Sequence, residues 1–289
     1  MARHRTIQIC GLNIAMHQPH DPESYMLLFR RAQSSQHRFK QGELHVLMLG
    51  SWSPATIEDS NAGLLSGYIY RFVRIDPREP WFNIETNQPA TDQEMGEINI
   101  PERLMAHLQT IPFVFNSRSH RLWYIAKDKD SSLGPKNAEK FFESILTKTA
   151  AQNRMPPVEV TAIPAEDSLD AIFQMHQLTR LVIDLKRPNP DDAASISRVF
   201  MEQLATQNVQ RQMTVMTASH GQSILPNEAT KTLAEVAALN GDVRGEGRDA
   251  LGLPLTEATS ERPLKRAERV NALVENALDV LKRVASSLI

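Results

Sequence analysis

The sequence of 289 residues contains a single cysteine, Cys10. One thiol cannot close a disulfide within the chain, and a sequence without a cysteine cluster lacks the ligands of the common thiolate zinc and iron–sulfur centres. Cys10 stands beside Ile9 in a segment whose apolar residues alternate. We therefore expect a buried small side chain here and not a reactive nucleophile.

Long apolar runs are missing as well. The apolar runs, such as residues 25–29, stop near about five residues, whereas a membrane-spanning helix needs roughly 18. The first ten residues pass from basic to alternating apolar positions without the apolar stretch and cleavage site of a secretion signal. These features predict a cytoplasmic protein whose first strand begins close to Met1.

The chain has no large excess of charge of either sign. It carries 32 Lys and Arg against 34 Asp and Glu, for a net charge of −2, and 41 % of its residues are hydrophobic. A balance of this kind excludes a histone-like polycation and an acidic disordered chain. It also supplies enough apolar residues for a substantial core.

Glycine-rich phosphate loops are absent. No glycine occurs between Gly134 and Gly221, and neither Gly-x₄-Gly-Lys-Ser/Thr nor Gly-x-Ser-x-Gly is found. This excludes a P-loop nucleotidase and disfavours a nucleotide-binding α/β domain or a serine hydrolase with a nucleophile elbow. Gly241, Gly245 and Gly247 follow an alanine-rich helical segment and are typical of a twisted β-ribbon.

The first half of the chain has the patterns of β-structure. Its candidate strands are rich in β-branched and aromatic residues, several alternate with period two, and turn residues bound them. A helix over residues 25–38 interrupts them, and Pro101 predicts a short helix that ends near Leu108. The expected strands are residues 6–14, 44–49, 67–75, 111–115 and 121–126.

From residue 134 onward, helical and strand patterns alternate, and residues 266–288 predict a long C-terminal helix with one apolar stripe. That stripe either packs on its own domain or mediates a dimer. We predict an α+β protein with a β-rich N-terminal domain (1–133) and a mixed strand-helix domain (134–289). The expected middle elements are a helix over 137–152, a strand over 157–163, a helix over 165–175, strands over 178–185 and 212–218 with a helix over 191–206 between them, and a helix over 226–238.

An acidic cluster follows the apolar strand that ends at Leu185. In one interpretation, Asp191 or Asp192 caps the next helix while the neighbouring prolines fix an extended turn. In the other, Asp184, Asp191 and Asp192 converge on Mg²⁺ as in a metal-dependent nuclease. Because no nuclease signature is complete, we predict no catalytic site, metal or cofactor and keep the nuclease as an alternative.

Basic residues recur in local groups. Gathered on one face, they would contact phosphates and bind nucleic acid with little sequence preference, and Trp123 or Tyr124 could stack a base. In the alternative interpretation they are solvated, and acids such as Glu261 and Glu268 cancel their field. The candidate nucleic-acid-binding residues are Arg30, Arg31, Arg38, Arg118, Arg121, Lys186, Arg187 and Arg266.

The order of elements, with the string from Leu181 to Asp192, resembles the RexA-like and KwaB-like group of phage-defence proteins at the level of architecture. The resemblance implies a bacterial cytoplasmic sensor or effector that binds double-stranded DNA through a basic surface, so DNA is favoured over RNA as the nucleic acid. It also implies a second defence protein as partner, of the kind often associated with the membrane.

Together these observations predict a homodimeric, non-enzymatic component of anti-phage defence that binds nucleic acid. Two alternatives stay open beside it. One is the metal-dependent nuclease described above. The other is a protein-interaction adaptor that recognises a phage or host protein.

Overall fold

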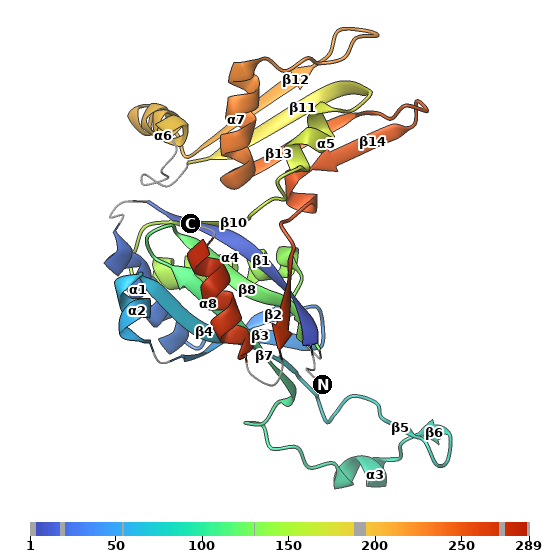
Figure 1. Ribbon diagram of the computed structural model, residues 1–289. Helices are drawn as coiled ribbons and strands as arrows, with labels where there is room; N and C mark the ends of the chain where they lie inside the picture. The colour runs from blue at the N-terminus through green and yellow to red at the C-terminus, as the bar shows by residue number, and fades with distance from the viewer. Residues whose placement is uncertain are drawn as a thin grey trace.

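The computed structural model builds the chain around two antiparallel sheets (Figure 1). No helix in the part of the chain that it describes is both long enough and apolar enough to span a membrane. The described residues are 4–17, 21–53, 55–129, 131–187, 195–271 and 275–287.

The large sheet has nine strands in the order β10-β1-β8-β7-β4-β3-β2. β15 also pairs with β1, and β9 pairs with β8. One half of the long strand β1 pairs with β10 and the other half with β15, so distant parts of the chain meet along it. The strands are β1 (His4–Met16), β2 (Phe39–Gln41), β3 (His45–Trp52), β4 (Leu64–Val73), β7 (Ala106–Asn116), β8 (Arg121–Asp128), β9 (Ser131–Ser132), β10 (Val158–Ala162) and β15 (Arg266–Asn271).

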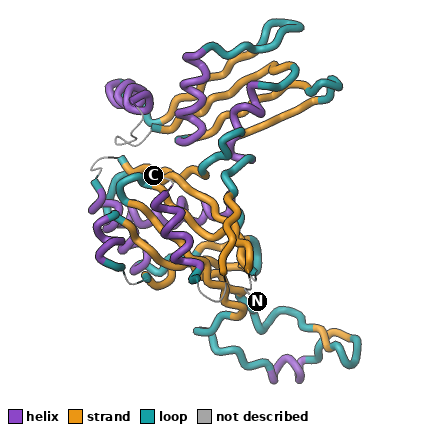
Figure 2. The backbone as a smooth tube through the Cα atoms, in the orientation of Figure 1, coloured by secondary structure: helices purple, strands orange, loops and turns teal. Residues whose placement is uncertain are grey.

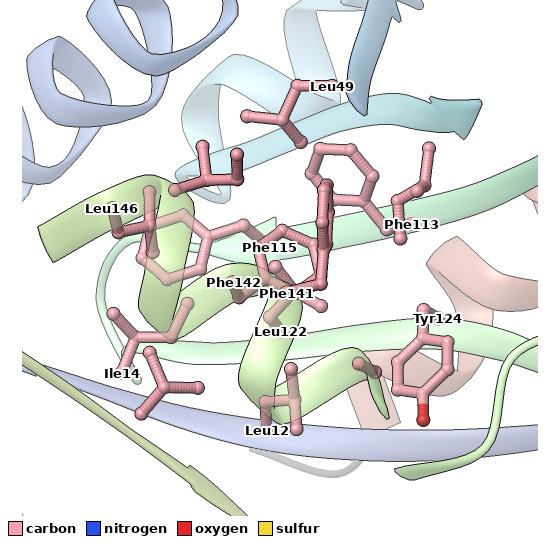
Figure 3. Close-up of a cluster of buried hydrophobic side chains, with 14 of the residues drawn as sticks. Leu12, Ile14, Leu49, Phe113, Phe115, Leu122, Tyr124, Phe141, Phe142 and Leu146 are labelled. Carbon is pink, nitrogen blue, oxygen red and sulfur yellow. The ribbon is translucent and has the colours of Figure 1, made fainter. Parts of the chain in front are cut away.

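Helices cover both faces of this sheet. Successive residues of a strand point to opposite faces, and the two hydrophobic cores divide β8 accordingly: Leu122 and Tyr124 belong to one core, Trp123 and Ile125 to the other. The first core, drawn in Figure 3, includes residues of α1 (Pro22–Ser34) and α4 (Pro135–Gln152). The second includes the apolar side of α8 (Ala277–Ser287).

The small sheet has the order β12-β11-β13-β14. Its core joins Ile183 and Val243 of the sheet to Leu204, Ala234 and Ala237 of the helices. The elements are α5 (Ser168–Phe173), β11 (Gln177–Lys186), α6 (Ser195–Thr206), β12 (Arg211–Thr217), α7 (Glu228–Leu239), β13 (Gly241–Arg248), β14 (Pro254–Ala258) and the 3₁₀ turn η1 (Thr259–Glu261).

Polar contacts join the two sheets. The side chain of Asn13 on β1 donates to the Leu239 carbonyl at 3.1 Å and to Asn240 Oδ1 at 3.0 Å. Lys186 at the end of β11 pairs with Glu159 of β10 at 3.0 Å. Hydrogen-bonded contacts of this kind fix the small sheet beside the β1–β10 edge of the large one.

Between β4 and β7 the chain leaves the sheet as a long excursion, here called the arm (residues 74–105). Figures 1 and 2 show it projecting from the end of the large sheet opposite the small one. None of residues 74–105 has a buried side chain. The arm carries the short strands β5 (Phe82–Asn83) and β6 (Gln88–Pro89) and the helix α3 (Asp92–Glu97). Another short helix, α2 (Ile57–Asn61), lies outside the arm, just before β4.

The predicted fold class is confirmed: the protein is α+β with a strand-rich N-terminal part. The predicted division at residues 133 and 134 does not separate the two sheets, because α4, β10, β15 and α8 all pack in or on the large sheet. The predicted ribbon after Asn240 is the β13–β14 hairpin.

One predicted helix is too long, and another is absent from the described residues. Residues 266–271 form β15 and pair with β1, so the C-terminal helix is the shorter α8. The predicted apolar stripe combined inward-facing residues of a strand, such as Val270, with those of a helix. The apolar side of α8 packs on its own chain. Residues 102–103 form a turn after Pro101, and β7 begins at Ala106.

Candidate nucleic-acid interface

The structure distributes the eight predicted basic residues over both sheets. Arg38 lines a pocket at the base of the arm, whereas Lys186 and Arg187 line a small crevice between the sheets. Trp123 and Tyr124 are buried and cannot stack a base. The remaining candidates lie on α1 (Arg30, Arg31), in the β7–β8 turn (Arg118), on β8 (Arg121) and on β15 (Arg266).

Lys186, Arg266 and Arg118 make defined side-chain contacts. Lys186 lies between Glu159 at 3.0 Å and Glu143 at 4.0 Å. Arg266 pairs with Glu268 at 2.6 Å, and Arg118 donates to the Asn61 carbonyl at 2.6 Å. Acid neighbours thus reduce the local positive charge at two of the three positions.

Asp184, one of the three predicted metal ligands, is engaged by an arginine. Both of its carboxylate oxygens accept from Arg211, at 2.6 and 2.5 Å, a bidentate pair across β11 and β12. Asp191 and Asp192 lie outside the described residues. In the part of the chain that the structure describes, no three His, Cys, Asp or Glu side chains are grouped to hold a metal ion.

A cavity of about 730 Å³, here called the arm-root pocket, lies where the arm leaves the sheet. Its floor includes Val46 of β3 and Phe72 of β4, which are cross-strand neighbours. The two roots of the arm, residues 74–78 and 100–105, supply the walls. A volume of this size lies within the usual range for small-ligand sites.

Four cations line the arm-root pocket: Arg38, Lys40, Arg74 and Arg78. Lys40 is opposite Val46 in the β2–β3 pairing, so its side chain starts from the pocket face of the sheet. Arg38 directly precedes β2, Lys40 lies within it, and Arg74 directly follows β4, so these cations come from separate segments of the chain. Strand pairing therefore assembles the cationic rim.

Two acids, Asp76 and Glu102, also line the pocket. Arg78 donates from Nε and Nη2 to the two oxygens of Asp76, each at 3.1 Å. The hydrogen bonds from Arg78 lower the pKa of Asp76 to about 2. One acid is therefore held ionised against one arginine, while Arg38, Lys40 and Arg74 give the rim its positive excess.

More positive charge lies behind the pocket, on the opposite face of the same sheet end. Arg71 precedes Phe72 and donates to the side chains of Gln41 and Gln109, which are neutral acceptors. Burial lowers the pKa of Arg71, and burial together with the charges of Arg71 and His107 lowers the pKa of His45. The shift at Arg71 reflects burial alone, whereas the charge of Arg71 contributes to the shift at His45 and adds positive charge to this end of the sheet.

Of the eight predicted residues, Arg38 belongs to this pocket. Reasoning from the sequence missed Arg74 and Arg78 as site residues because they are far from Arg38 along the chain. The signal that could have found them is their position on either side of Pro77, where an apolar strand ends in basic residues.

Comparison with known proteins adds a family but no activity. No curated protein matches the sequence. The model of one family, described as "Domain of unknown function (DUF4747)", matches residues 5–286. Since the match extends over both sheets and nearly the whole chain, the protein belongs to the DUF4747 family.

Proposed function

We propose that the arm-root pocket binds an unpaired stretch of nucleic acid, DNA in preference to RNA. The observation that carries the proposal is the combination of a cationic rim with an apolar floor in one cavity. Phosphates would contact Arg38, Lys40 and Arg74, and a base would lie over Val46 and Phe72. Proteins that bind single strands without sequence preference combine these two elements.

An unpaired strand fits the pocket better than a duplex. Phe72 is 8 % exposed and lies at the bottom of a concavity, where a splayed base can enter but a stacked base pair cannot.

The nuclease alternative has less support than binding. Asp184 is engaged by Arg211, and the other two proposed ligands lie outside the described residues. The role in phage defence, with a second protein as partner, stays a prediction that rests on the resemblance of the sequence.

Fluorescence anisotropy with a labelled single-stranded oligonucleotide of mixed sequence tests the proposal. We expect the wild-type protein to bind it more tightly than the matching duplex. The double variant R38A/R74A should lose about tenfold or more in affinity, since each lost phosphate contact of about 1 kcal/mol or more acts on the same ligand.

A matched control removes the same charge elsewhere. Lys136 and Lys148 are exposed on α4, and K136A/K148A should bind like the wild type. Equal affinity of R38A/R74A and the wild type, or no binding by the wild type at low salt, would contradict the proposal.

A further inference from the structure

The arm has an unusual distribution of charge. Residues 79–102 contain six acids and no Lys, Arg or His. Since the whole chain has a net charge of −2, the rest of the molecule carries +4. The cations of the arm, Arg74, Arg78 and Arg103, all lie at its root. The arm is thus negative along its outer part and positive at its base.

Hydrogen bonds within the arm order its outer part. The ring nitrogen of Trp81 donates to the Pro77 carbonyl at 3.2 Å, and Ala90 N donates to the Trp81 carbonyl at 2.8 Å. Glu94 accepts from the Thr91 backbone at 2.7 Å and from the Asn83 side chain. Local hydrogen bonds therefore define the conformation of the tip.

Apolar side chains are exposed at both ends of the arm. At the tip, Phe82 is 58 % exposed and Ile84 is 87 % exposed. At the root, Leu104 is 56 % exposed and Leu108, just inside β7, is 60 % exposed. Exposed apolar side chains that lie close together in the sequence at the two ends of the arm suit contact with a partner.

We propose that the arms of two copies of this chain lie antiparallel, so that the acidic tip of each covers the basic root of the other. A two-fold axis through the middle of the arms makes both contacts at once, because a two-fold interface is self-complementary. Glu85, Asp92 and Glu97 of one copy then face Arg74 and Arg103 of the other, and Phe82 and Ile84 face Leu104.

Charge complementarity selects a second copy as the occupant. A tip whose charged residues are all acids attracts a cationic surface, and the chain offers one at the other end of the same arm. Opposite charges across an interface also fix the register and exclude the parallel arrangement, in which tip would meet tip. The inference stands independently of nucleic-acid binding, although the two share the arm-root cations.

Sedimentation velocity and light scattering of the full chain at low salt test the arrangement. The wild type should be a dimer. The tip variant E85K/E97K should be a monomer, since both positions are exposed and no side-chain hydrogen bond within the arm is lost at them. The control E166K/E235K makes the same charge change at exposed positions away from the arm and should stay dimeric.

A charge swap between two variants provides a more specific test. The root variant R74E/R103E should also be monomeric. Mixed with E85K/E97K it should form a heterodimer, because both tip-root contacts of that pair are again between opposite charges. A monomeric wild type, a dimeric tip variant, or a mixture that stays monomeric would each overturn the proposal.

The two proposals fail separately. E85K/E97K leaves the pocket residues intact, so it should bind the oligonucleotide at least as well as the wild type even as a monomer. Loss of dimerisation with retained binding supports both proposals. A dimer that binds no oligonucleotide would contradict only the proposed function.

Discussion

Lys282 of α8 places its Nζ 2.7 Å from Oδ2 of Asp59, although 223 residues separate the two in the chain. Asp59 also belongs to the capping box of α2, where Thr56 donates to its carboxylate through the backbone. Burial disfavours the ionised Asp59, but the hydrogen bonds from Lys282 and Thr56 outweigh it and lower the pKa of the carboxyl group. This pair fastens the C-terminal helix to the N-terminal half of the large sheet.

Replacing Lys282 with methionine should lower the free energy of unfolding by about 2–3 kcal/mol, because it leaves a largely buried carboxylate without its cation and with only the capping-box hydrogen bonds of Thr56. Asp59 has a lowered folded pKa, so its stabilising contribution is present above about pH 4 and is lost as the pH falls through the folded value. The difference in the free energy of unfolding between wild type and K282M, measured with urea, should therefore be larger at pH 7 than at pH 3. An equal difference at both pH values would contradict this account.

Gly241 begins β13 at a point where backbone crowds backbone. A Cβ added there would lie 2.0 Å from the Asp184 carbonyl oxygen, an atom that cannot move without breaking the β11–β13 pairing. We expect G241A to lose about 3 kcal/mol or more of stability. Nothing lies near a Cβ added at Gly96 in α3, so G96A should be neutral or slightly stabilising. Thermal unfolding of G241A, G96A and the wild type measures both effects.

Cys10 should be inert in the folded protein. Its side chain is fully buried, and burial raises the pKa of the thiol to about 11. At pH 8 a thiol-specific reagent should label the native protein slowly and the urea-unfolded protein rapidly, since only the thiolate reacts. Fast labelling of the native protein would show that β1 does not hold Cys10 in the core.

If both proposals hold, nucleic acid and the second copy compete for the arm-root cations. Titrating a single-stranded oligonucleotide into the dimer should then yield monomers with bound oligonucleotide, because the acidic tip and the phosphates have the same charge. Sedimentation velocity with separate detection of protein and oligonucleotide measures this directly. An oligonucleotide-bound dimer of undiminished stability would contradict the competition.

Much of the fold follows from local patterns. Alternating apolar positions predicted β1, β8 and β11, and helical spacing of Phe141, Phe142, Ile145 and Leu146 predicted α4. Where a strand and a helix lie end to end, as β15 and α8 do, their apolar residues merged into one false stripe. The partner that makes residues 266–271 a strand is β1, and no local pattern identifies a partner some 260 residues away.

The site depended on contacts that the sequence does not display. Arg38 was predicted from a local basic group, but its pocket partners Arg74 and Arg78 reach it only because β2 pairs with β3 and β3 with β4. Lys186 belonged to another basic group, and the fold places Glu159 against it from a different strand. Sequence shows where charge is, whereas tertiary pairing decides which charges remain unbalanced.

The salt dependence of single-strand binding tests the central claim most directly. Each phosphate contact contributes about −0.7 to the slope of log association constant against log salt concentration, so three or four rim cations predict a slope between about −2 and −3 over roughly 50 to 200 mM salt. R38A/R74A should reduce the magnitude of that slope by about 1.4, and K136A/K148A should leave it unchanged. A slope in R38A/R74A equal to that of the wild type would show that the arm-root pocket does not hold the phosphates.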